Sequence, residues 1–116
     1  MKKSVIISLL LCAASSFCGE KILLPMPKNA KLIDVRTPEE FKTGFISGAV
    51  NIPHDRIKEK ISAVVPDKKT PLYLYCRSGR RVGVAMKSLK NAGYSVMYNL
   101  GGVKEAGNKL GIPLKK

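Results

Sequence analysis

Short apolar runs alternate with helix-type patterns along most of the chain. Each run is short enough for a buried strand, and the patterns between them place apolar residues on one helical face. The predicted strands are residues 32–35, 49–52, 72–75 and 96–98, with a further short strand at 22–24. The predicted helices begin near residue 38, near 57, at the end of the segment 76–81 and near 103. This alternation is typical of an α/β fold with a mainly parallel sheet and helices on both faces.

The helix boundaries carry recognisable capping residues. Thr37 is a good N-cap, Pro38 suits the first helical position, and Glu40 completes a capping box. Gly93 follows the apolar stripe of the third helix and is expected at its C-terminal end. Ligands of parallel sheets bind beyond the carboxyl ends of the strands. Cys76, which directly follows the strand at 72–75, is therefore a candidate site residue.

The N-terminus resembles a secretory leader. Lys2 and Lys3 precede a short apolar stretch at residues 5–14, and small residues follow it. We expect a signal peptide at residues 1–18, with cleavage after Ser16 or after Cys18, a connector at 19–30 and one domain at 31–116. The alternatives are an uncleaved anchor and a buried N-terminal strand. A lipidated cysteine is disfavoured because the residues before Cys12 and Cys18 are large. The predicted location is outside the cytoplasm, in a bacterial periplasm.

Composition and charge limit the function classes. The chain has 116 residues, enough for one domain, and a formal net charge of +13, which the loss of Lys2 and Lys3 lowers to +11. Such a charge favours anionic partners. The basic residues are spread along the chain without aromatic interleaving, so we expect no nucleic-acid partner. No cysteine or histidine cluster suggests a metal.

The candidate chemistry lies in the segment Cys76-Arg77-Ser78-Gly79-Arg80-Arg81. It connects a predicted strand to a predicted helix, so its backbone N–H groups and the helix N-terminus can converge on an anion. A thiol at that focus is expected to ionise readily. The alternative is an inert core cysteine, which the three arginines disfavour. Cysteine-dependent phosphatases and arsenate reductases use a similar loop, but one residue longer than the four-residue gap between Cys76 and Arg81.

Several motifs together resemble the rhodanese homology domain family, in particular its small secreted single-domain members. The resemblance covers about residues 30–102 and includes the runs 34–41 (DVRTPEEF), 44–53 (GFISGAVNIP) and 75–81 (YCRSGRR), with Gly93-Tyr94 and Gly101-Gly102. The family often has a histidine where Phe45 stands and an aromatic after the double glycine. The resemblance implies a single rhodanese-like domain with a mainly parallel five-stranded sheet.

The resemblance also implies a double-displacement sulfurtransferase that needs no metal or organic cofactor. Cys76 would take sulfane sulfur from thiosulfate and pass it to cyanide or a thiol. The backbone of the loop would bind the anionic substrate: Arg77, Ser78, Gly79, Arg80 and Arg81. The competing hypothesis is a non-enzymatic persulfide carrier or anion-binding module that serves a partner protein. The sequence is silent on the oligomeric state.

Supporting roles are expected for the remaining polar residues. Asp34 is expected to accept backbone hydrogen bonds near its strand end, and Arg36 to pair with Glu40. The arginines Arg77 and Arg80 are expected to point outward, whereas Arg81 either reaches back to the loop or pairs with an acid. His54 is expected to be a capping or exposed residue rather than a base.

Overall fold

The computed structural model describes residues 26–116, and its centre is a parallel sheet. Four strands lie in the order β3-β1-β4-β5, and every neighbouring pair is parallel. They are β1 (Lys31–Asp34), β3 (Val50–Asn51), β4 (Leu72–Cys76) and β5 (Met97–Gly102). The strand predicted at residues 22–24 and the predicted leader at 1–18 lie outside the described residues.

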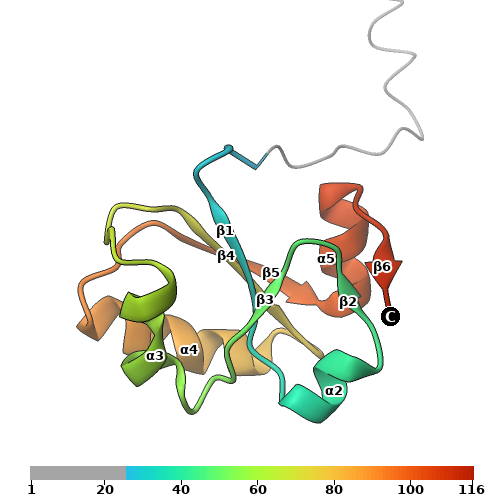
Figure 1. The fold of residues 1–116 in the computed structure, drawn as a ribbon, viewed down its shortest axis with the longest axis horizontal. Helices are drawn as coiled ribbons and strands as arrows, with labels where there is room; N and C mark the ends of the chain where they lie inside the picture. Colours follow the sequence, from blue (N-terminus) through green and yellow to red (C-terminus); the bar gives the residue numbers. More distant parts are fainter. Residues whose placement is uncertain (1–25) are drawn as a thin grey trace, which may run out of the picture.

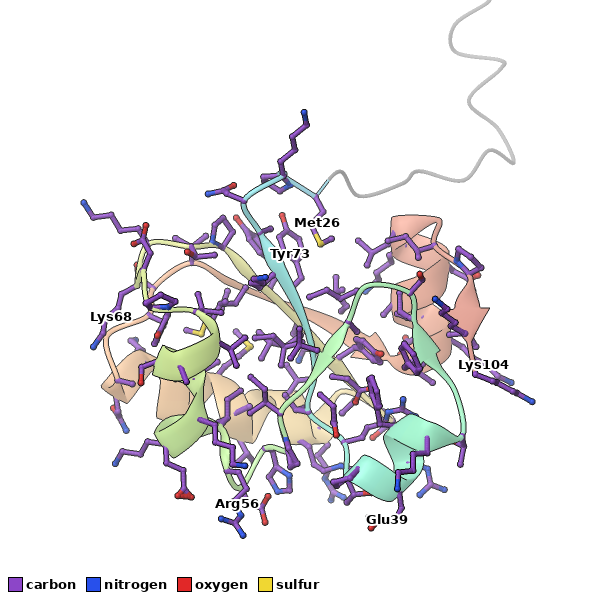
Figure 2. The ribbon with its side chains drawn as sticks, viewed as in Figure 1. Met26, Glu39, Arg56, Lys68, Tyr73 and Lys104 are labelled. Carbon is purple, nitrogen blue, oxygen red and sulfur yellow. The ribbon has the colours of Figure 1, made fainter. Side chains whose placement is uncertain are left out.

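Helices cover both faces of this sheet, as the sequence predicts (Figure 1). The helices α3 (Ile57–Val64) and α4 (Arg80–Asn91) pack on one face, and α5 (Val103–Leu110) packs on the other. The short helix α2 (Pro38–Lys42) lies at the end of the sheet where the strands finish (Figure 1). In Figure 2, Glu39 and Arg56 mark this end, and Met26 lies at the opposite one.

Alternation along β4 divides the core into two clusters. Leu72, Leu74 and Cys76 face α3 and α4, whereas Tyr73 and Tyr75 face α5. All five residues of β4 are buried, which is typical of a central strand in a parallel sheet. The side chain of Cys76 is therefore part of the core at the carboxyl end of its strand.

A feature that the sequence does not predict is a small second sheet. The strands β2 (Phe45–Ile46) and β6 (Leu114–Lys115) pair in antiparallel register. Phe45 stacks on Phe41 of α2, with ring centroids 4.2 Å apart. The pairing of β2 with β6 connects the C-terminal segment to the segment that follows α2. Within residues 26–116, no helix has the length and apolar character needed to span a bilayer.

Candidate active site

The loop after β4 bends around the sulfur of Cys76. The Cys76 side chain is 0% exposed, and the Gly79 N–H donates a hydrogen bond to its Sγ at 2.8 Å. Gly79 adopts φ +94°, which a residue with a side chain rarely adopts, and α4 begins at the next residue. The prediction of a tight loop between β4 and the N-terminus of α4 is confirmed.

The double glycine of β5, Gly101-Gly102, packs against the backbone of this loop. Gly102 is paired in register with Cys76, and a Cβ on Gly102 would collide with the carbonyl oxygen of Arg77. A Cβ on Gly79 would lie 3.1 Å from the Cα of Gly101. Asn99, which belongs to no recognised motif, donates from its amide to the Gly79 carbonyl at 3.3 Å. The two glycines therefore allow the closest approach of β5 to the loop backbone.

The three arginines of the loop differ in their surroundings. Arg77 has a side chain that is 78% exposed and lies 3.9 Å from a carboxylate oxygen of Glu40. Arg80 is exposed. Arg81 forms a two-pronged ion pair with Glu40, with Nη1–Oε1 at 2.8 Å and Nη2–Oε2 at 3.0 Å. Of the two expectations for Arg81, pairing with an acid is the one observed.

Glu40 therefore joins α2 to the start of α4. Its Oε1 also accepts the backbone N–H of Thr37 at 3.0 Å, which completes the predicted capping box. The hydrogen bond from Arg81 lowers the pKa of Glu40 from its ordinary value of 4.5 to about 2. The same hydrogen bond raises the pKa of Arg81. The expected pairing of Arg36 with Glu40 is wrong, because Arg81 occupies that carboxylate.

Arg36 instead forms a buried pair with Asp34. Its Nε lies 2.9 Å from Oδ1 and its Nη2 lies 2.5 Å from Oδ2, and Nη2 also donates to the Gly44 carbonyl at 2.6 Å. Burial by itself lowers the pKa of Arg36, but the hydrogen bond and charge of Asp34 outweigh it and the pKa is raised. Asp34 also accepts the Arg36 backbone N–H at 2.9 Å, as expected. This pair fixes the chain between β1 and α2.

A shallow hollow of about 360 Å³ opens beside the loop. Its lining includes Arg36, Glu40, Thr43 and Arg77. His54 lies apart from this lining and is half-buried, and its backbone N–H donates to the Val35 carbonyl at 3.0 Å. Over residues 26–116, acidic, histidine and cysteine side chains form no group of three or more that could hold a metal ion.

Comparison with known proteins identifies the domain. Residues 21–109 match the family model described as the rhodanese-like domain. The chain belongs to the rhodanese family. This match confirms the resemblance that the motifs around residues 34–41, 44–53 and 75–81 indicate.

Rhodanese relatives span most of the chain. Thiosulfate sulfurtransferase PspE of Escherichia coli is 40% identical over 82 residues, which cover 71% of this chain and 79% of PspE. A sulfurtransferase of Allochromatium vinosum is 35% identical over 87 residues, covering 75% of this chain and 79% of that protein. A solved E. coli rhodanese with anions has a TM-score of 0.68 and 38% identity, covering 75% of this chain and 98% of its own.

These relatives support a single rhodanese domain of the PspE kind, with sulfur transfer as its general chemistry. A sulfurtransferase requires a sulfur donor and an acceptor. In this rhodanese domain, the loop and its buried thiol lie at the carboxyl end of β4, where ligands of parallel sheets bind.

Proposed function

We propose that this rhodanese is a thiosulfate sulfurtransferase that works through a persulfide on Cys76. The observation that carries the proposal is the position of the Cys76 sulfur. It lies at the end of a buried strand, under a loop whose Gly79 N–H points at it, 2.8 Å away. A sulfur held in this way faces backbone donors that can stabilise negative charge on it and on a bound anion.

The first half-reaction transfers one sulfur atom to the enzyme. The Cys76 thiolate attacks the outer sulfur of thiosulfate and a new S–S bond forms. The original S–S bond breaks, and its electron pair leaves with sulfite. The products are a Cys76 persulfide anion and sulfite, so atoms, charge and electrons balance. Backbone N–H groups of residues 77–81 would hold the oxygens of thiosulfate and of the departing sulfite.

The second half-reaction passes the sulfur on. A thiolate or cyanide attacks the outer sulfur of the persulfide, and the S–S bond to Cys76 breaks with its electron pair returning to Cys76. The acceptor leaves as a persulfide or as thiocyanate. No metal, organic cofactor or external oxidant enters either step. The basic charge around the loop favours arrival of an anionic donor. A related E. coli rhodanese solved with anions supports this kind of ligand.

A turnover assay tests the proposal. The wild-type protein is mixed with thiosulfate and cyanide, and thiocyanate is followed over time beside a Cys76→Ser variant. We expect steady thiocyanate formation by the wild type, and none above the uncatalysed background with the variant. Mass spectrometry after thiosulfate alone should show one added sulfur atom on the wild type.

The same two measurements distinguish the enzyme from the competing hypothesis of a non-enzymatic persulfide carrier. A single added sulfur without turnover to cyanide or to a small thiol would indicate a persulfide carrier that requires a partner protein. Neither persulfide nor thiocyanate would overturn the proposal, provided that circular dichroism shows a folded protein.

A further inference from the structure

Glu40 is the point at which the first helix of the domain touches the active loop. Both of its carboxylate oxygens contact Arg81, and Oε2 also lies 3.9 Å from Arg77. Glu40 comes from α2 and Arg81 from the first turn of α4, 41 positions further along the chain. The contact therefore connects two elements that a capping residue alone would not connect.

This ion pair holds the Arg81 guanidinium against Glu40 of α2. Two parallel N–H···O bonds, at 2.8 and 3.0 Å, use both terminal nitrogens of Arg81. A two-pronged arginine–carboxylate pair fixes orientation as well as distance. The two side chains are only 25% and 24% exposed, so water competes weakly for them. The Arg81 guanidinium is consequently fixed on the carboxylate of Glu40.

The backbone of Arg81 lies where an anion would bind. The N–H groups of the first turn of a helix have no partner within that helix. Arg80 and Arg81 are the first two residues of α4, directly after the Gly79 N–H that points at the Cys76 sulfur.

We propose that Glu40 is a positioning residue that acts through Arg81. It holds the guanidinium against α2, so that backbone N–H groups, and not a mobile arginine side chain, bind the anion opposite Cys76. This inference rests on the proposed sulfurtransferase function and names a residue outside the loop on which turnover depends. A free Arg81 would bind thiosulfate and sulfite more tightly, yet in a geometry that does not suit attack by the thiolate.

The inference predicts opposite effects on affinity and on turnover. In Glu40→Gln, we expect kcat for thiosulfate to fall about tenfold, because misplaced binding groups cost reactivity. The KM for thiosulfate should stay equal or decrease, because an uncompensated cation near the site attracts the anion. Alkylation of Cys76 by anionic iodoacetate relative to neutral iodoacetamide should rise about threefold, the size expected of one nearby charge in a solvent-exposed cleft.

Two controls separate positioning from charge and from helix capping. Glu59→Gln makes the same charge change at an exposed residue of α3 that does not line the hollow beside the loop, and should alter each quantity less than twofold. Thr37→Ala removes the hydroxyl that accepts the Glu40 N–H at 3.2 Å and donates to Glu40 Oε1 at 3.1 Å, but it keeps both side chains of the Glu40–Arg81 pair. A role of Glu40 that is only structural would make Thr37→Ala as slow as Glu40→Gln.

A double-mutant cycle gives the decisive result. In an Arg81→Gln background, Glu40→Gln should lower kcat by no more than a further twofold, because the arginine through which Glu40 acts is already absent. A double variant whose loss equals the product of the two single losses would overturn the inference. A folded Glu40→Gln with the wild-type kcat would also overturn it, as would a Glu59→Gln that reproduces the effects of Glu40→Gln.

Two further measurements keep the test independent of folding and of the proposed function. If Glu40→Gln does not fold, Arg81→Lys replaces it, because lysine keeps the charge but cannot form the two-pronged pair. If the wild type does not turn over thiosulfate, the proposed function fails, and the same cycle is measured on the iodoacetamide alkylation rate of Cys76. Additive effects in that cycle would refute the role of Glu40 as well.

Discussion

At Gly102, β5 lies so close to the backbone of the loop that Gly102→Ala should displace the loop. The added Cβ would overlap the carbonyl oxygen of Arg77, which is backbone and cannot rotate away. It would also lie 3.3 Å from a carboxylate oxygen of Glu105, which can adjust. Gly102 itself has φ −82°, so the substitution introduces no backbone strain of its own. The effect is therefore purely a displacement of the loop from β5.

The magnitude follows from the size of the overlap. The Arg77 carbonyl must move by roughly 1 Å to reach an ordinary contact, and a misplacement of that size near reacting atoms costs about 100-fold in rate. Forcing an extra methyl group into a packed region destabilises a protein by about 1–3 kcal/mol. For a domain of this length, each kcal/mol lowers Tm by about 4–8 °C. We expect a folded, less stable protein with about 1% of the wild-type kcat.

Thermal melts followed by circular dichroism, combined with the thiosulfate–cyanide assay, measure both effects. Gly83→Ala is the matched control, because a Cβ at this position in α4 meets nothing within 4 Å. Replacing glycine by alanine in a helix interior should stabilise the protein by about 0.5–1 kcal/mol. A Gly102→Ala protein that keeps its wild-type kcat would show that β5 does not set the position of the loop.

Two further predictions concern stability. The folded pKa of Glu40, about 2, lies below its ordinary value of 4.5, so its contribution is fully present above pH 4.5 and is lost as the pH falls toward 2. This contribution to the free energy of unfolding amounts to at most about 3 kcal/mol. Between pH 4.5 and 2, the free energy of unfolding should therefore fall more steeply for the wild type than for Glu40→Gln. Parallel curves for the two proteins would contradict this prediction. Tyr94 donates its buried hydroxyl to the Val65 carbonyl, and Tyr94→Phe should lower the free energy of unfolding by about 1–2 kcal/mol in urea melts, because that carbonyl loses its partner. An unchanged urea midpoint would refute that assignment.

Features that depend on local pattern follow from the sequence. The strands β1 and β4 are short apolar runs that the pattern locates to within one residue, and β3 falls within the predicted range 49–52. The strand predicted at 96–98 is longer in the structure, because β5 continues to Gly102 through polar and glycine residues. The capping box of α2 is encoded within four consecutive residues, Thr37 to Glu40. The loop from Cys76 to Arg81 is recognisable because a buried strand, a glycine and a helix start follow one another without a gap.

Features that depend on residues far apart in the sequence cannot be predicted from the local sequence pattern. Arg36 and Arg81 are both within reach of an acid, and only the folded arrangement decides that Asp34 takes the first and Glu40 the second. Residues 45–46 and 114–115 are too short and irregular to be recognised as paired strands. The bond from Asn99 to the loop joins residues 20 positions apart, and no local pattern in β5 indicates it.

Backbone groups, rather than side chains, give this active loop its shape. Arg77, Ser78 and Arg80 are exposed, whereas Gly79 has a left-handed backbone and Gly102 has no room for a Cβ. In the proposed function, backbone groups of the loop hold the sulfur and the anion, and the exposed side chains select which molecules approach. Changes of charge at Arg77 or Arg80 should alter the choice of donor or acceptor more than the bond-making step. A change at Gly102 should slow that step about 100-fold. This separation of roles between backbone and side chains is consistent with a reactive thiol at Cys76 that has no exposed surface of its own.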